Sequence, residues 1–92
     1  MTTGSCLCGQ VRWQFERSSG RMSHCHCSMC RKAHGAAFAT MLTVAESDFR
    51  WTVGQDTKVQ YEATPGAELL RSFCPTCGSA LPASTAAAAE YF

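Results

Sequence analysis

The chain has 92 residues, which is enough for one domain and near the size at which an apolar core alone gives only marginal stability. Hydrophobic residues make up 46% and charged residues 16%, a composition typical of a globular rather than a disordered protein. The formal net charge is +1, and the basic residues are scattered apart from the pair Arg31 and Lys32. This charge pattern argues against nucleic acid as a partner.

Targeting signals are the next feature that the sequence can exclude or predict. No stretch is long and apolar enough to span a bilayer, so we expect no membrane partner. The first ten residues, MTTGSCLCGQ, lack the basic start and apolar run of a signal peptide. Seven cysteines would suggest disulfides in a secreted chain, but the number is odd and the C-x-C and C-x-x-C spacings suit metal ligands better. We therefore predict a reducing, cytoplasmic location.

Alternation of apolar and polar residues predicts short strands, and Gly, Pro and Ser mark the turns between them. In chain order, strands are expected at 10–16, 22–27, 37–44, 58–62 and 69–73, and turns at 17–21, 54 and 64–68. One helical turn is expected over 29–34, capped by Ser28 and ended by Gly35, with a short helix or turn at 45–49. The aromatic residues assigned to the core are Trp13, Phe15, Trp51 and Tyr61, and Val59 is expected on the inner face beside Tyr61.

The alanine-rich tail at 83–92, ASTAAAAEYF, differs from the rest of the chain. Its alanines favour a helix, but it has no apolar stripe, so a frayed or partner-dependent end is an equal alternative. The remaining pattern predicts one mainly β domain over 1–92, a small fold of short antiparallel sheets. Its apolar residues are too few to hold it without a staple, which the cysteines can supply.

Four of the cysteines form two knuckle-like pairs at the two ends of the chain. Cys74 and Cys77 are separated by two residues and followed by a glycine, and Cys6 and Cys8 form a tighter version of the same pattern. A trailing glycine lets the backbone turn so that its N–H groups point at the sulfurs. Two pairs give the four ligands of a structural zinc site, which would close the chain across the 65 residues between Cys8 and Cys74.

The other three cysteines, Cys25, Cys27 and Cys30, predict a second metal site with two open interpretations. A closed structural site would recruit His24, His26 or His34 as its fourth ligand, whereas an open site would keep one position for a substrate. On a strand, the first two of these histidines point away from the face that Cys25 and Cys27 share. His34 could reach the metal if the turn after Cys30 is helical.

Three ordered motifs carry a resemblance to a known family. They are GSCLCGQV at 4–11, CHCSMCRK at 25–32 with GAAF at 35–38, and FCPTCGSAL at 73–81. Together they resemble the glutathione-dependent formaldehyde-activating enzyme family over most of the chain, from about Gly4 to Leu81. The resemblance implies a β-tent-like zinc fold of coiled antiparallel sheets and two zinc ions per chain. It assigns the structural zinc to Cys6, Cys8, Cys74 and Cys77, and a catalytic zinc with a replaceable fourth ligand to Cys25, Cys27 and Cys30.

The same resemblance implies a reaction and its substrates. The enzyme would join glutathione to formaldehyde, or to another small aldehyde, forming S-hydroxymethylglutathione as a carbon–sulfur lyase. A thiol entering an open zinc position loses its proton to the charge of the metal, which generates the nucleophile. Arg31 and Lys32 could hold the glutathione carboxylates, with solvated surface charges as the alternative. His26 could assist proton transfer, with a hydrogen-bonded supporting role as the alternative.

Two features leave a different function open. Family members usually continue past the 73–81 motif with further strands, so the domain is expected to be shortened at its C-terminal end. An uncovered sheet edge or apolar face would then favour a homodimer through residues 83–92. The alternative to the enzyme is a non-catalytic zinc-binding module for protein interaction, which would not need a zinc ion accessible to thiols.

Overall fold

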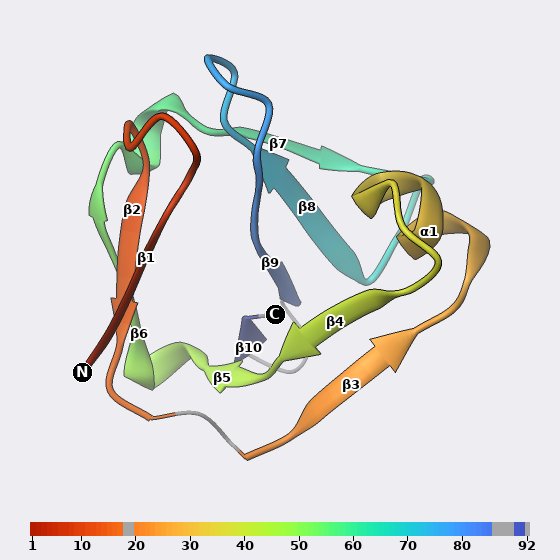
Figure 1. Ribbon diagram of the computed structural model, residues 1–92, viewed down its shortest axis with the longest axis horizontal. Helices are drawn as coiled ribbons and strands as arrows, with labels where there is room; N and C mark the ends of the chain where they lie inside the picture. Colours follow the sequence, from red (N-terminus) through yellow and green to blue (C-terminus); the bar gives the residue numbers. More distant parts are fainter. Residues whose placement is uncertain (18–19, 86–89, 92) are drawn as a thin grey trace.

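Three small antiparallel sheets form the protein, and they stand around a triangular frame in the computed structural model (Figure 1). The structure describes residues 1–17, 20–85 and 90–91. The strands are β1 Thr2–Ser5, β2 Arg12–Phe15, β3 Met22–Cys25, β4 Ala39–Leu42, β5 Val44–Ala45, β6 Phe49–Val53, β7 Val59–Glu62, β8 Leu69–Phe73, β9 Ala80–Thr85 and β10 Glu90–Tyr91. The helix α1 spans Ser28–His34, and two 3-10 turns, η1 and η2, span Glu46–Asp48 and Gln55–Thr57.

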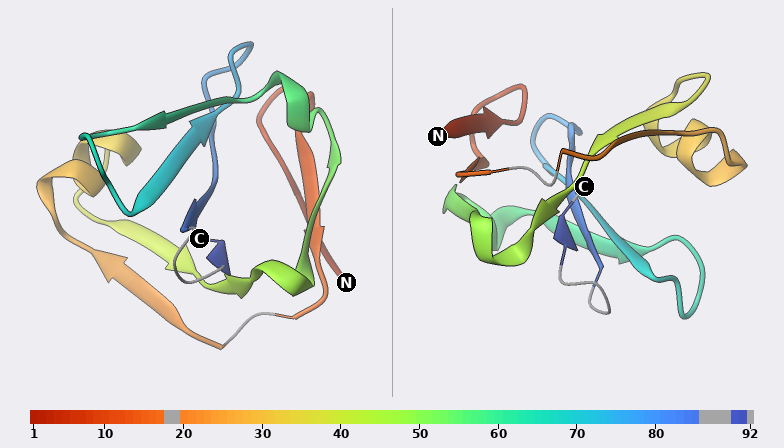
Figure 2. Two further views of the ribbon diagram at one scale, coloured as in Figure 1. Left: turned by 180° about the vertical axis from the view of Figure 1, so that it is seen from behind. Right: turned by 90° about the horizontal axis from the view of Figure 1, so that it is seen from below.

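The order of strands explains how distant cysteines meet. One sheet has the order β1-β2-β6, a second the order β5-β10-β9-β8-β7, and β3 pairs with β4 in a third. Figure 2 shows these sheets from behind and from below, with α1 at the corner where β3 and β4 diverge. The hairpin turns after β1 and β8 approach each other at another corner, and each carries a pair of cysteines.

The buried core is small and contains two cysteines. Val11 and Cys74 are fully buried, and Cys6 and Leu81 complete the cluster, with Trp13 and Trp51 packed against it. These two tryptophans meet edge to face with their ring centroids 6.0 Å apart. A core that relies on thiols as apolar members agrees with the prediction that a staple is needed.

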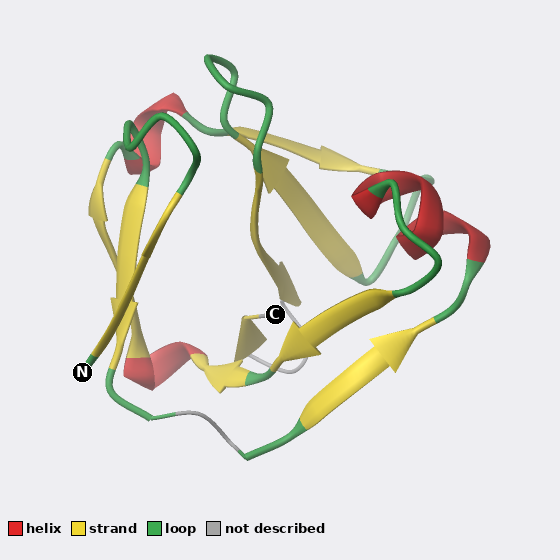
Figure 3. Ribbon diagram, viewed as in Figure 1, coloured by secondary structure: helices red, strands yellow, loops and turns green. Residues whose placement is uncertain are grey.

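Most of the predicted elements are confirmed, including the mainly β class and the small antiparallel sheets (Figure 3). The helix at Ser28–His34 ends at Gly35, whose left-handed φ of 58° is the predicted stop. The predicted cap was wrong by one residue, because Cys27 rather than Ser28 occupies the N-cap. Two of the five residues of the 17–21 turn, 18 and 19, lie outside the described residues.

Two expectations about strands and faces need correction. Tyr61 and Val59 are 40% and 39% exposed, so neither is a core residue, and Tyr61 instead meets Phe73 at the sheet surface. The described parts of the tail are strands rather than helix, since β9 extends to Thr85 and β10 pairs with both β9 and β5. Residues 86–89 and 92 lie outside the described residues, and the homodimer expected through the tail stays a prediction.

Tertiary pairing explains why the described residues of the tail, 83–85 and 90–91, are strands. Tyr91 stacks on Phe49 with ring centroids 3.9 Å apart, which ties β10 to the sheet that carries β6.

Among the helices of the described part of the chain, none is long and apolar enough to cross a membrane.

Candidate metal centres

Four cysteine sulfurs from the two ends of the chain converge in one cluster. Cys6 and Cys8 follow β1, and Cys74 and Cys77 follow β8; their Sγ atoms all lie within 4.8 Å of one another. The Sγ atoms of Cys6 and Cys8 are 3.6 Å apart, and those of Cys8 and Cys74 are 3.8 Å apart. The predicted pairing of the two knuckles is therefore the one that the fold brings together.

The two knuckles share a backbone pattern. The amide of Cys6 donates to the Val11 carbonyl at 3.0 Å, and the amide of Cys74 donates to the Ser79 carbonyl at the same distance. In each knuckle the trailing glycine, Gly9 or Gly78, donates back to the carbonyl of the first cysteine. Their φ angles of 80° and 75° are left-handed, which explains why glycine occupies both positions.

Hydrogen bonds to the sulfurs stabilise their ionised form. The Val11 amide donates to Cys6 Sγ at 3.4 Å, and the Ser79 Oγ atom lies 3.2 Å from Cys77 Sγ. The Ser79 hydroxyl, followed by the Ser79 amide, lowers the pKa of Cys77 to about 5. Because the Leu7 amide also donates to Ser79 Oγ at 3.0 Å, this serine links the two knuckles.

The remaining three cysteines form a second cluster at the start of α1. The Sγ atoms of Cys25, Cys27 and Cys30 lie within 4.8 Å of one another, and the first two are 3.5 Å apart. Cys27 caps the helix, since its Sγ accepts a hydrogen bond from the Cys30 amide at 3.3 Å. That amide, with the Cys30 and Cys25 thiols, lowers the pKa of Cys27 to about 7. Burial raises the pKa of the Cys30 thiol, which is 4% exposed.

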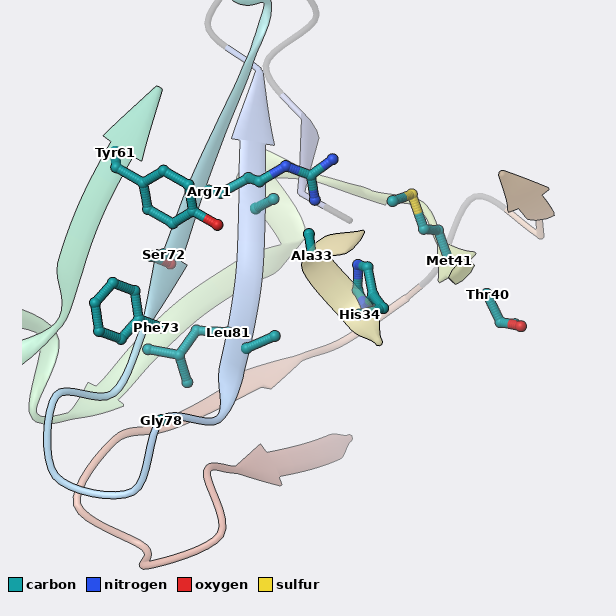
Figure 4. Close-up of a pocket in the computed structure, with 12 residues that line it drawn as sticks. Ala33, His34, Thr40, Met41, Tyr61, Arg71, Ser72, Phe73, Gly78 and Leu81 are labelled. Atoms are coloured by element: carbon teal, nitrogen blue, oxygen red, sulfur yellow. The ribbon is translucent and has the colours of Figure 1, made fainter. Parts of the chain in front are cut away.

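The described histidines do not complete this cluster. None of them brings a ring nitrogen within 4.8 Å of all three sulfurs in the described part of the chain. His24 binds Thr40 Oγ1 through Nδ1 at 3.1 Å, and both His24 and His26 pack against Phe38. His34 lines a cavity instead, together with residues of β8 and β9 (Figure 4). The geometry therefore favours a site whose fourth position is not filled by a histidine.

Both clusters fit zinc by the chemistry and spacing of their donors. Four sulfurs bound at about 2.3 Å to one tetrahedral zinc ion lie about 3.8 Å from one another. The separations of 3.6 and 3.8 Å in the first cluster, and of 3.5 Å between Cys25 and Cys27 in the second, are close to this spacing. All seven cysteines are free thiols, so each can serve as a ligand. The clusters could thus hold one ion each, with four protein sulfurs for the first and three for the second.

Arg71, which the sequence pattern did not single out, connects the three-cysteine cluster to a cavity of about 220 Å³. Arg71 on β8 donates from Nη2 to Cys30 Sγ at 3.4 Å and also lines this cavity, with its side chain extended toward α1 (Figure 4). The cavity wall also includes Tyr61, Ser72 and His34. Nothing in the sequence spacing marks an arginine 41 positions from Cys30. Its only signal is that it is a charged residue within the predicted strand at 69–73.

The two basic residues selected from sequence are differently placed. Arg31 and Lys32 follow Cys30 on α1, and both are exposed. Lys32 lines a second cavity, of about 390 Å³, together with Met29 and Arg71. This placement gives Lys32 access to a ligand near the cluster.

Comparisons with known proteins agree with the geometry. A sequence model of the glutathione-dependent formaldehyde-activating enzyme family matches residues 1–92. A crystal structure of a Rhodobacter sphaeroides protein has a TM-score of 0.79 to this chain and 28% sequence identity, over 98% of this chain and 81% of that one. No curated protein matches the chain. The family match confirms the resemblance carried by the three cysteine motifs.

Proposed function

The chain belongs to the glutathione-dependent formaldehyde-activating enzyme family, and on that premise we propose that it condenses glutathione with formaldehyde to S-hydroxymethylglutathione as a carbon–sulfur lyase. One observation carries the proposal. Three sulfurs, those of Cys25, Cys27 and Cys30, lie at metal-ligand spacing with no described fourth side chain, beside a cavity. A structural site would have four ligands, as the other cluster does.

We assign a structural role to the four-cysteine cluster and a catalytic role to the three-cysteine cluster. Cys6, Cys8, Cys74 and Cys77 would hold a structural zinc ion that ties the two ends of the chain together. Cys25, Cys27 and Cys30 would hold a second ion and leave one position for the substrate thiol. A zinc ion bound there supplies the positive charge that lowers the pKa of an entering thiol and keeps it ionised at neutral pH.

The reaction needs no oxidant or reductant. The ionised sulfur of glutathione attacks the carbonyl carbon, and a C–S bond forms as the C=O double bond becomes single. The carbonyl oxygen takes up a proton, and the proton of the thiol has already passed to solvent. The task of the protein is to hold the thiol ionised and oriented in the cavity, because formaldehyde is itself strongly electrophilic.

Charged groups around the cavity suit a peptide thiol with two carboxylates. Lys32 lines the larger cavity and would bind one carboxylate, and Arg31 would assist from the exposed side of α1. His34 lines the smaller cavity and is better placed than His26, which packs on Phe38, to exchange a proton with the aldehyde oxygen. The free thiols are suited to a reducing compartment such as the cytoplasm.

The rate of condensation tests this function. We expect the protein to accelerate formation of S-hydroxymethylglutathione from glutathione and ¹³C-formaldehyde, followed by NMR, above the spontaneous rate. The Cys27→Ser variant is the control, because it loses one sulfur of the open cluster and keeps the four-cysteine cluster. Equal rates with wild type, with Cys27→Ser and without protein would contradict the enzyme and favour a zinc module that binds other proteins.

A further inference from the structure

The two cysteine clusters use the same kind of ligand but have different surroundings. In the four-cysteine cluster, the described hydrogen-bonding contacts of the sulfurs come from neutral groups, among them the Val11 amide and the Ser79 hydroxyl. In the three-cysteine cluster, one sulfur contact comes from a charged group, since the Arg71 guanidinium donates from Nη2 to Cys30 Sγ. One permanent positive charge therefore distinguishes the cluster with three sulfurs from the cluster with four.

Arg71 is buried without a carboxylate partner among the described residues. Its exposed fraction is 8%, and no carboxylate of the described residues forms an ion pair with it. A buried unpaired charge is costly, and a guanidinium does not lose its proton in proteins. The thiolate of Cys30 is the contact that can offset this charge.

The position of Arg71 on β8 coincides with an irregularity in strand pairing. Arg71 lies opposite Tyr61 on β7, but its pairing with β9 is irregular, because the register shifts between Leu70 and Ser72. Across this shift, β9 contains one more residue than β8, and Pro82, which has no amide hydrogen, lies there. Such bulges re-aim side chains and are frequent next to active sites.

Charge balance shows what a guanidinium does for an open centre. Three thiolates and one Zn²⁺ ion carry a net charge of about −1, so a fourth thiolate would bring the centre to about −2 in a buried setting. We propose that Arg71 is a positioning residue that makes the three-cysteine centre accept an ionised thiol as its fourth ligand. It does so by holding Cys30 and by offsetting one negative charge. This inference rests on the proposed function, and it identifies Arg71 as the residue that favours an ionised thiol at the open position of the centre.

Arg71 has a second possible role that the test must separate. A guanidinium has five N–H donors, and those not used by Cys30 could bind a glutathione carboxylate in the cavities that Arg71 lines. A carboxylate clamp would act on glutathione but not on 2-mercaptoethanol, which has no carboxylate. Charge offset at the sulfur would act on both thiols equally.

Cobalt-substituted protein gives a readout that does not depend on activity. Thiolate ligands produce charge-transfer absorption with Co²⁺, so each thiol can be titrated against a spectrum in which the closed four-cysteine centre serves as a constant background. We expect both thiols to change the wild-type spectrum. Arg71→Gln should raise the apparent Kd of both by about tenfold or more, the range known for groups that support metal ligands.

Two variants control for charge and folding. Arg17→Gln removes the same charge from a side chain that is 82% exposed, and it should titrate like wild type. Arg71→Lys keeps the charge but loses the planar fork, and it should recover at least half of the lost binding free energy for both thiols. If Arg71→Gln fails to fold, Arg71→Lys decides: binding of both thiols within threefold of wild type supports charge offset, and a tenfold loss overturns it.

The remaining outcomes each have one meaning. An unchanged Kd for both thiols in a folded Arg71→Gln would overturn the inference while leaving the proposed function intact. Weaker binding of glutathione alone would overturn it in favour of a carboxylate clamp. No spectral change with either thiol in wild-type protein would overturn both this inference and the proposed function.

Discussion

Cys8 and Cys74 bring their Sγ atoms to 3.8 Å from each other although they are 66 positions apart in the chain. No helix or single hairpin spans this separation; the two knuckles meet only because β1 and β8 end at the same corner of the fold (Figure 1). Metal binding at such a site contributes on the order of 10 kcal/mol to folding. The four-cysteine cluster is therefore expected to control the stability of the whole domain.

The first prediction is that loss of one sulfur unfolds the protein in the four-cysteine cluster but not in the three-cysteine cluster. Cys74→Ser should unfold the chain or make it insoluble, because it removes a fully buried ligand that joins the two ends. Cys27→Ser should stay folded with one zinc ion, because its cluster lies within one local turn and Cys27 is exposed. Circular dichroism and elemental analysis check this, with two zinc ions per chain expected in wild type. Equal folding of the two variants would contradict the division.

The second prediction concerns Ser79, which links the two knuckles. Ser79→Ala removes the hydroxyl beside Cys77 Sγ and leaves the Leu7 amide without its acceptor. We expect a loss of about 1–3 kcal/mol in the free energy of unfolding, measured by urea denaturation. Ser23→Ala, on the exposed surface of β3, is the matched control and should change it by less than about 0.5 kcal/mol. A difference of zero between the two variants would contradict a supporting role for Ser79.

The third prediction is that a chelator removes the two ions in order. The three-cysteine centre offers fewer protein ligands and includes the exposed Cys27, so its ion should leave first. The circular dichroism spectrum should then stay folded with one ion bound, and it should collapse only when the second ion leaves. Release of both ions in a single step together with unfolding would show that the sites are not independent.

The fourth prediction uses the pKa of Cys27 in protein stripped of the first ion. The Cys30 amide, with neighbouring thiols, lowers this pKa from 9.0 to about 7, so the thiolate predominates above pH 7. Its contribution to stability is complete above the unfolded pKa of 9.0 and is lost as the pH falls through about 7. Alkylation of Cys27 by iodoacetamide should follow the same midpoint. Buried Cys30, with its raised pKa, should react slowly at pH 7; faster labelling of Cys30 than of Cys27 would contradict this.

Local signals in the sequence were sufficient for the cysteine groups and the turns. The trailing glycines Gly9 and Gly78 adopt the left-handed conformation that the knuckle pattern requires, and Gly35 ends α1 as predicted. The cap of that helix was misassigned because a thiol is an unusual capping group. Cys27 nevertheless accepts the hydrogen bond that Ser28 was expected to accept.

Tertiary contacts determined what the sequence did not reveal. For the tail, the sequence left a helix and a frayed or partner-dependent end as equal alternatives, but pairing with β8 makes β9 a strand as far as Thr85. The alternation at β7 was read correctly as a strand, yet the sheet leaves Val59 and Tyr61 exposed because β7 is an edge strand. Arg71 could not be assigned to the site, since its contact with Cys30 depends on how β8 packs against α1.

Calorimetry of glutathione and S-methylglutathione tests the central claim, an open thiol-binding position on the three-cysteine centre, most directly. The methylated peptide keeps every charge of glutathione, but its thioether has no proton to give up and is a poor zinc ligand. Glutathione should bind wild type far more tightly than S-methylglutathione, with a heat that varies with the ionisation enthalpy of the buffer because a proton is released. Cys27→Ser should lose this preference. Equal affinity of the two peptides for wild-type protein, with no buffer dependence, would contradict the account.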